Sequence, residues 1–256
     1  CGQEPVCGQE PMRSQEVLTP DRPGAEPSAQ AGANDNVRRV LHHPEYSPMD
    51  LNPDLDRLPQ PLRASMLAAG REIRECYRVL EKADLNIVGE VLRGQGDFVE
   101  MAHYPPDDVF DRETCGQYYY HAHRGGETEH GHFHTFLRAG GMPDGSAPVD
   151  HPLSGQSWPS GDDAICHLIA ISMDAWGYPI GLFCTNRWVT DEAWYPAQQV
   201  TAMLERFAID HAFPNWCVNR WLGAMLRLYR PHIEALIRQR DAVLAQWQTQ
   251  HPGTDI

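Results

Sequence analysis

The strongest constraint in this sequence is the spacing of five histidines within the stretch YYYHAHRGGETEHGHFHTF. His121 and His123 lie two residues apart, and so do His130, His132 and His134. In a β-strand, residues i and i+2 project from the same face. Each set therefore predicts a strand that carries its imidazoles on one side, and the glycine-containing segment between the sets predicts a hairpin loop.

The pairing register of this hairpin decides whether the two sets meet. If His123 lies opposite His132, then His121 lies opposite His134, and four imidazoles form a two-by-two patch on one face. Any other register that keeps both sets on one face would also allow a metal site. A slip of one residue would divide them between the two faces. His130 lies at the loop edge and is expected to support the site rather than to bind directly. The opposite face is predicted to be core and carries Tyr118, Tyr120, Phe133 and Leu137.

Composition limits the classes of protein that need to be considered. A chain of 256 residues with 41% hydrophobic and 22% charged residues is long enough to bury a full core. The formal charge of -14, from 21 basic and 35 acidic residues, argues against a nucleic-acid partner. No apolar run of about 18 residues predicts a transmembrane segment. A small-molecule ligand remains open, and the sequence indicates no oligomeric state.

Seven dispersed cysteines, an odd number, are typical of reduced thiols and favour a cytoplasmic location. The alternative is a lipid-anchored protein, because Cys1 followed by glycine resembles the processed end of a bacterial lipoprotein. Residues 1–58 contain eight prolines and one aromatic residue, Tyr46, and predict a disordered tail. Residues 59–250 are predicted to form a single α+β domain.

Within that domain, apolar periodicity predicts the order of the elements. The expected architecture is a four- to five-stranded antiparallel sheet with helices packed on one face. Asp84 and Thr190 are expected to be helix N-caps. Pro231 is expected to kink or interrupt the C-terminal helical run before Ile233. Residues 98–114 are expected to hold a strand fragment and a loop. Helices are predicted at about 61–82, 84–94, 196–211, 215–230 and 233–247. Strands are predicted at 117–123, at 131–138, and as two central apolar runs at 165–172 and 179–186.

The histidine patch has the composition of a transition-metal site. Two His-x-His pairs on facing strands can place three or four nitrogens around one ion, so His121, His123, His132 and His134 are the candidate ligands. Imidazole suits zinc, iron, copper, manganese or nickel, and ligand type alone does not choose among them. Three ligands and an open position would give a Lewis acid or an activated water. Glu127 and Glu129 could complete the coordination shell or act as a general base.

A second candidate site lies after the last predicted strand. Asn186 and Arg187 precede an expected helix N-terminus, where a substrate carboxylate can be held, and the alternative is that Arg187 pairs with an acid such as Asp191. His167 has the same two readings, as a member of the site or as a buried structural residue.

Three functions follow from these residues. The first is a metal-dependent enzyme, an oxygenase or a hydrolase. The second is a non-enzymatic module that binds a small ligand, a metal or another protein. The third is a structural domain whose histidines form a polar, pH-responsive face.

Two resemblances bear on these alternatives. Residues 167–192, together with YYYHAHR and EHGHFHTF, look like a bacterial family classed as a domain of unknown function. This similarity covers about residues 60–245. It implies one domain behind a variable tail, and it does not point to any particular activity. The spacing of Gly116, His121, His123, Glu127 and Gly131 is also similar to the first motif of the cupin barrels, with shortened intervals. The expected second cupin motif is missing, because the PxG at 179–181 is followed by Cys184 where a histidine would stand.

Overall fold

The computed structural model describes residues 51–123 and 128–254 of the chain. Most of the predicted tail, residues 1–50, lies outside the described residues, and so does Glu127. The last part of the predicted tail contains a short 3-10 helix, η1 (Leu55–Arg57), which is followed directly by the first long helix.

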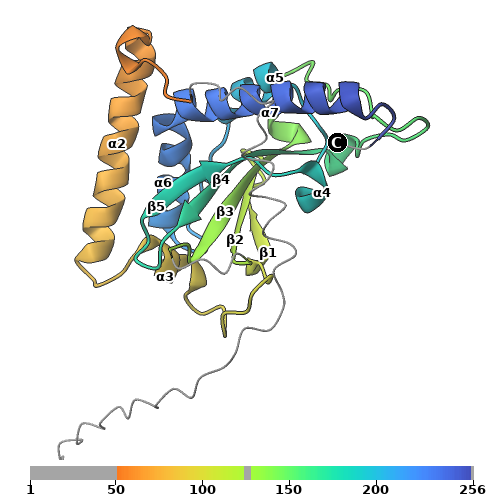
Figure 1. Ribbon diagram of the computed structural model, residues 1–256. Helices are drawn as coiled ribbons and strands as arrows, with labels where there is room; N and C mark the ends of the chain where they lie inside the picture. The colour runs from red at the N-terminus through yellow and green to blue at the C-terminus, as the bar shows by residue number, and fades with distance from the viewer. Residues whose placement is uncertain (1–50, 124–127, 255–256) are drawn as a thin grey trace, which may run out of the picture. The chain divides into compact units, whose positions relative to one another are not determined.

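Five strands form one antiparallel sheet in the order β1-β2-β3-β4-β5, so neighbours in sequence are neighbours in space (Figure 1). This open sheet confirms the α+β class and the predicted four to five strands. It also removes the comparison with cupin barrels, since the sheet does not close. The strands are β1 (Tyr104–Phe110), β2 (Gly116–His121), β3 (Gly131–Arg138), β4 (Ile165–Met173) and β5 (Pro179–Phe183).

The helices begin and end where the sequence supplies caps and prolines. Pro61 opens the first long helix, and Pro231 lies in the first turn of the last one, so the predicted interruption of the C-terminal helical run before Ile233 is confirmed. The Asn215 side chain caps α6 by accepting hydrogen bonds from the backbone amides of Cys217 and Val218, at 2.8 and 3.3 Å. The helices are α2 (Gln60–Glu81), α3 (Ile87–Leu92), α4 (Arg187–Thr190), α5 (Ala197–Leu204), α6 (Trp216–Leu228) and α7 (Arg230–Gln250), with 3-10 turns η2 (Ala139–Gly141) and η3 (Gly161–Asp163).

The two faces of the sheet differ in chemistry, as the alternation predicts. On the core face, Tyr118 and Phe133 are fully buried and contact α6. The Tyr118 hydroxyl donates to Asn219 Oδ1 at 2.6 Å, and the Phe133 and Trp221 ring centroids are 5.9 Å apart. Helix α2 then packs on α6, where Glu72 pairs with Arg220 and Arg227 (Figure 1). The histidines therefore lie on the face opposite α6.

The central hairpin adopts a register two residues away from the pairing of His123 with His132. His121 lies opposite His132, and Tyr119 lies opposite His134. Strand β2 ends at His121, and His123 lies beyond the paired residues. A shift of two residues preserves parity, and the histidines of both strands therefore still share one face.

A bulge in β4 adds another histidine to this face. Thr135 pairs with Ile169, but Phe136 pairs with His167, so Leu168 is the extra residue. Without the bulge, His167 would lie opposite Leu137 on the core face. The bulge thus turns the His167 side chain to the histidine face.

Several predicted boundaries are wrong for identifiable reasons. Asn86, rather than Asp84, caps α3 by accepting from the Gly89 amide at 2.9 Å. The strand expected within residues 98–114 is present at residues 104–110, and it accommodates two prolines because an edge strand leaves some amides unpaired. Strand β5 is an edge strand and not a central one, since among the described residues it pairs only with β4.

Two further predictions fail near the C-terminal half. Thr190 ends α4 instead of capping a helix, because Asp191 adopts a left-handed conformation with φ of 50°. The helix predicted over 196–211 ends at Leu204, and the following segment contacts the β1–β2 turn. There the Thr114 hydroxyl donates to the Ala208 carbonyl at 2.6 Å. No helix of the described residues is both long and apolar enough to cross a membrane.

The contact between the β1–β2 turn and residue 208 makes Gly116 a sensitive position. A Cβ atom at Gly116 would overlap the backbone carbonyl oxygen of Ala208, so we expect Gly116→Ala to lower the free energy of unfolding by about 1–3 kcal/mol. Gly70→Ala is the matched control, because its Cβ would meet only Leu228 Cδ1 at 3.8 Å inside a helix. That variant should gain about 0.5–1 kcal/mol. Urea unfolding measures both, and equal stabilities would contradict this packing.

Candidate metal centre

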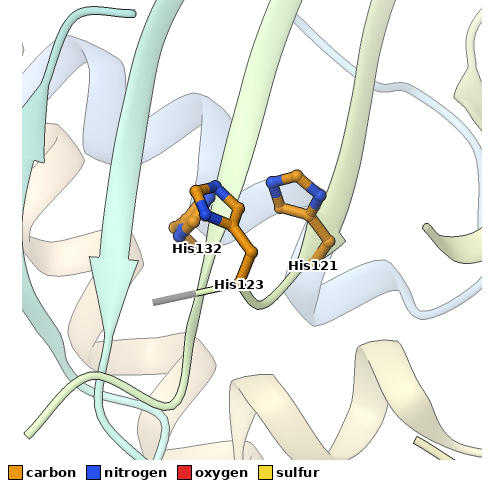
Figure 2. A group of neighbouring side chains, drawn as sticks. All are labelled: His121, His123 and His132. Carbon is orange, nitrogen blue, oxygen red and sulfur yellow. The ribbon is translucent and has the colours of Figure 1, made fainter. Parts of the chain in front are cut away.

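Three histidines converge at the end of the central hairpin. One ring nitrogen from each of His121, His123 and His132 lies within 4.8 Å of the others (Figure 2). His121 and His132 are buried on β2 and β3, whereas His123 is exposed just after β2. The ring centroids are 4.6 Å apart for His121 and His132, and 5.0 Å for each pair with His123. Three imidazoles at this spacing, two of them buried, can hold a metal ion.

A carboxylate fixes the orientation of His132. Glu129 Oε1 lies 2.6 Å from His132 Nδ1, and the imidazole is fully buried. Its other nitrogen, Nε2, is buried and has no hydrogen-bond partner among the described residues. Histidines that bind metals commonly place one nitrogen against a carboxylate in this way and offer the other nitrogen to the ion. A buried polar atom without a partner is otherwise costly.

His134 lies next to this triad and is 1% exposed. Its ring centroid is 4.9 Å from that of His132 and 5.1 Å from that of His121. Its Nδ1 lies 3.0 Å from His167 Nε2, while its Nε2 is buried without a hydrogen-bond partner in the described part of the chain. Burial, together with the neighbouring imidazoles, strongly lowers the pKa of His134, so the ring is neutral.

His167 connects this cluster to a buried acid. Burial, and secondarily the nearby Arg240 guanidinium, lower the pKa of His167 to about 3. The His167 backbone amide donates to Glu192 Oε2 at 2.5 Å. Burial raises the pKa of the Glu192 carboxyl to about 7, although the His167 amide and Arg240 oppose this shift. Glu192 lies two residues after Thr190, which was predicted to cap a helix, and the sequence alone indicated no role for Glu192 in the site.

His103 is a further member that the sequence did not indicate. Its ring stacks on Tyr119, with centroids 3.7 Å apart, and meets His121 edge-on at 5.5 Å. Its Nδ1 lies 2.9 Å from Asp108 Oδ1. The sequence offered little to identify this residue, because His103 lies far from the other histidines of the site and the two prolines that follow it obscured the extent of the next strand.

The remaining candidate residues lie elsewhere or contact other groups. His130 lies near the opposite face, where its Nδ1 is 2.7 Å from the Tyr120 hydroxyl. Asn186 is exposed and makes no side-chain cap for α4. The Arg187 guanidinium lies over the Trp158 ring, 5.0 Å from its centroid. Neither residue belongs to the histidine triad, and Glu127 lies outside the described residues.

Comparison with known proteins identifies a family for this chain. The model of a family described as a domain of unknown function, DUF6969, matches residues 67–256. No curated protein and no solved structure matches the chain significantly. The chemistry of the site must therefore be argued from its own residues.

The buried carboxyl of Glu192 predicts a pH dependence of stability. Its pKa rises from 4.5 in the unfolded chain to about 7 in the folded protein. Between these pH values the folded state keeps a proton that the unfolded state has lost, so the contribution of Glu192 to stability falls as pH rises from about 4.5 to about 7 and is constant above that range. Glu192→Gln should therefore gain stability relative to the wild type over this range, by roughly 1–3 kcal/mol.

Urea unfolding at a series of pH values measures this difference. The histidines affect both proteins alike, so the difference between the two curves isolates Glu192. Asp191→Asn is the matched control, because it removes an exposed carboxylate from the neighbouring position. Parallel curves for the wild type and Glu192→Gln would show that Glu192 does not titrate in this range.

Proposed function

Because this chain belongs to the DUF6969 family, whose description assigns no activity, we propose its function from the histidine cluster: it binds one transition-metal ion through His121, His123 and His132. The observation that carries this proposal is His132, which is held by Glu129 on one nitrogen and leaves the other buried without a hydrogen-bond partner among the described residues. Zinc, iron, copper and manganese all suit imidazole ligands, and the identity of the ion is an outcome of the experiment.

We further propose that the bound metal is catalytic. Three protein ligands leave a coordination position for water or substrate, and such an ion acts as a Lewis acid or activates water. The exposure of His123 supports this, since it puts one ligand in contact with solvent. The reaction class is hydrolysis or oxygenation. Glu127 and Glu129 as general bases, and Arg187 and Asn186 as substrate-binding residues, belong to this proposal.

Glu129 has a more specific role within the proposal. A carboxylate 2.6 Å from His132 Nδ1 fixes the tautomer that presents Nε2. A general base would instead face the open coordination position. The hydrogen bond to His132 therefore favours orientation of a ligand as the function of Glu129 and leaves Glu127 as the candidate base.

A second candidate function is supported by His134. Its Nε2 is buried without a hydrogen-bond partner in the described residues, and its ring lies within about 5 Å of two members of the triad. A fourth nitrogen would close the coordination shell and favour a non-enzymatic metal-binding protein. X-ray absorption of metal-loaded wild type and His134→Ala distinguishes the two functions. A three-histidine site has the same number of histidine ligands in the wild type and in the variant. A four-histidine site loses one histidine ligand in the variant, and solvent takes its place.

The metal site itself is tested by stoichiometry and stability. We expect untagged protein to retain about one equivalent of a transition metal by elemental analysis. After chelation, free metal at about 100 times its Kd should raise the free energy of unfolding by about 2.7 kcal/mol. His132→Ala should lose both effects, and His251→Ala, at the end of α7, should keep them. Metal-free protein that gains no stability from Zn²⁺, Fe²⁺, Cu²⁺ or Mn²⁺ would refute the proposal.

The role of Glu129 gives a graded prediction. Glu129→Gln keeps the size of the side chain but removes its charge, so we expect metal affinity to fall by about 10- to 100-fold while binding persists at one ion per chain. Competition with a chromophoric chelator measures the affinity. Glu113→Gln is a control for the loss of one acidic charge at a position outside the cluster. An affinity unchanged by Glu129→Gln would exclude its orienting role.

A further inference from the structure

A cavity with no assigned function lies at the other end of the histidine face. It has a volume of about 520 Å³, and its lining includes Gln117 of β2, Arg138 of β3 and Arg112 of the β1–β2 turn. A neighbouring cavity of about 670 Å³ shares part of its wall, including Asp162. We propose that these two cavities form one binding groove for a small organic carboxylate with an apolar body.

Arg138 supplies the main anchor for the carboxylate. Its Nε donates to Gln117 Oε1 at 2.6 Å, and Gln117 Nε2 donates to Asp108 Oδ2 at 2.7 Å. Gln117 is 7% exposed, so this support is buried. The guanidinium lies over the Phe110 ring, 5.5 Å from its centroid. These contacts hold the group in place before a ligand arrives, which lowers the entropic cost of binding.

The remaining donors of Arg138 match a carboxylate. With Nε occupied, the two terminal nitrogens, Nη1 and Nη2, make no hydrogen bond or ion pair with any described residue. An edge formed by two such nitrogens binds the two oxygens of a carboxylate in parallel. Arg112 lines the same cavity and is also without an ion pair in the described part of the chain. Asp107 and Asp162 line the wall too, but neither lies within ion-pairing distance of an arginine there.

The neighbouring cavity supplies the apolar half. Met142, Trp158 and Tyr195 line it, together with several prolines of the long segment before β4. The Trp158 indole is fixed because its Nε1 donates to the Val149 carbonyl at 2.5 Å and the Arg187 guanidinium lies over its ring. A ligand with a carboxylate at Arg138 can therefore extend an apolar group over Met142 and Trp158. Two arginines next to an aromatic wall favour this class over a neutral or cationic ligand.

The probes are 2-naphthoate and its neutral analogue 2-naphthamide, which have almost the same shape. Isothermal titration calorimetry with the full chain, in a buffer that contains a chelator, keeps this test independent of the metal site. We expect 2-naphthoate to bind one site per chain and 2-naphthamide to bind at least about tenfold more weakly. Arg138→Gln should reduce 2-naphthoate affinity at least about tenfold and leave 2-naphthamide unchanged.

Two variants make the result interpretable. Arg112→Gln should also weaken 2-naphthoate, and Arg112 is exposed with no side-chain bond to a described residue, so its loss does not threaten folding. Arg63→Gln removes an equal charge from the exposed face of α2 and should change nothing. The proposal is overturned if the wild type shows no saturable binding at about 1 mM ligand. It is equally overturned if both naphthalenes bind alike, or if neither Arg112→Gln nor a folded Arg138→Gln weakens 2-naphthoate.

Discussion

The antiparallel pairing that sets His121 opposite His132 is the contact on which the rest of the site depends. Side chains alternate along both strands, so this one pair fixes which residues of the hairpin face the helices and which face the histidine cluster. Tyr118 and Phe133 pack toward α6 only because His121 and His132 point the other way. The apolar core and the candidate metal site are therefore two consequences of the same register.

Burial makes the cluster chemically specific. An imidazole taken out of water is held in its neutral form, which is the form that binds metals, and the lowered pKa of both His134 and His167 reflects this. Neutral rings still need partners for two nitrogens each. Glu129 and His167 satisfy one nitrogen of His132 and of His134, and the second nitrogen of each stays buried. Burying a ring nitrogen without a partner costs free energy, and coordination of a bound cation would compensate for it. A polar face that binds no ion would have no such compensation.

The sequence predicted the parts of this structure that depend on local periodicity. The fold class, the β3 boundaries and the shared face of the histidines all follow from an alternation of two. The register could not be predicted, because hairpin loops of different length satisfy the same alternation. His167 joins the cluster through a bulge in β4, which moves its side chain to the other face of the sheet. The residues around the bulge do not distinguish it from a regular strand. His103 and Glu192 come from distant segments, and only tertiary packing brings them near the hairpin.

The same face of the sheet carries two kinds of chemistry, and one carboxylate supports both. Asp108 uses Oδ1 for His103, which packs against Tyr119 and His121, and uses Oδ2 for Gln117, which holds Arg138. A carboxylate bound at both oxygens cannot rotate without breaking a hydrogen bond, so the imidazole and the guanidinium are fixed relative to each other. The arginine groove and the histidine cluster thus have a defined separation along β2, which is what a ligand that contacts both ends of this face would require.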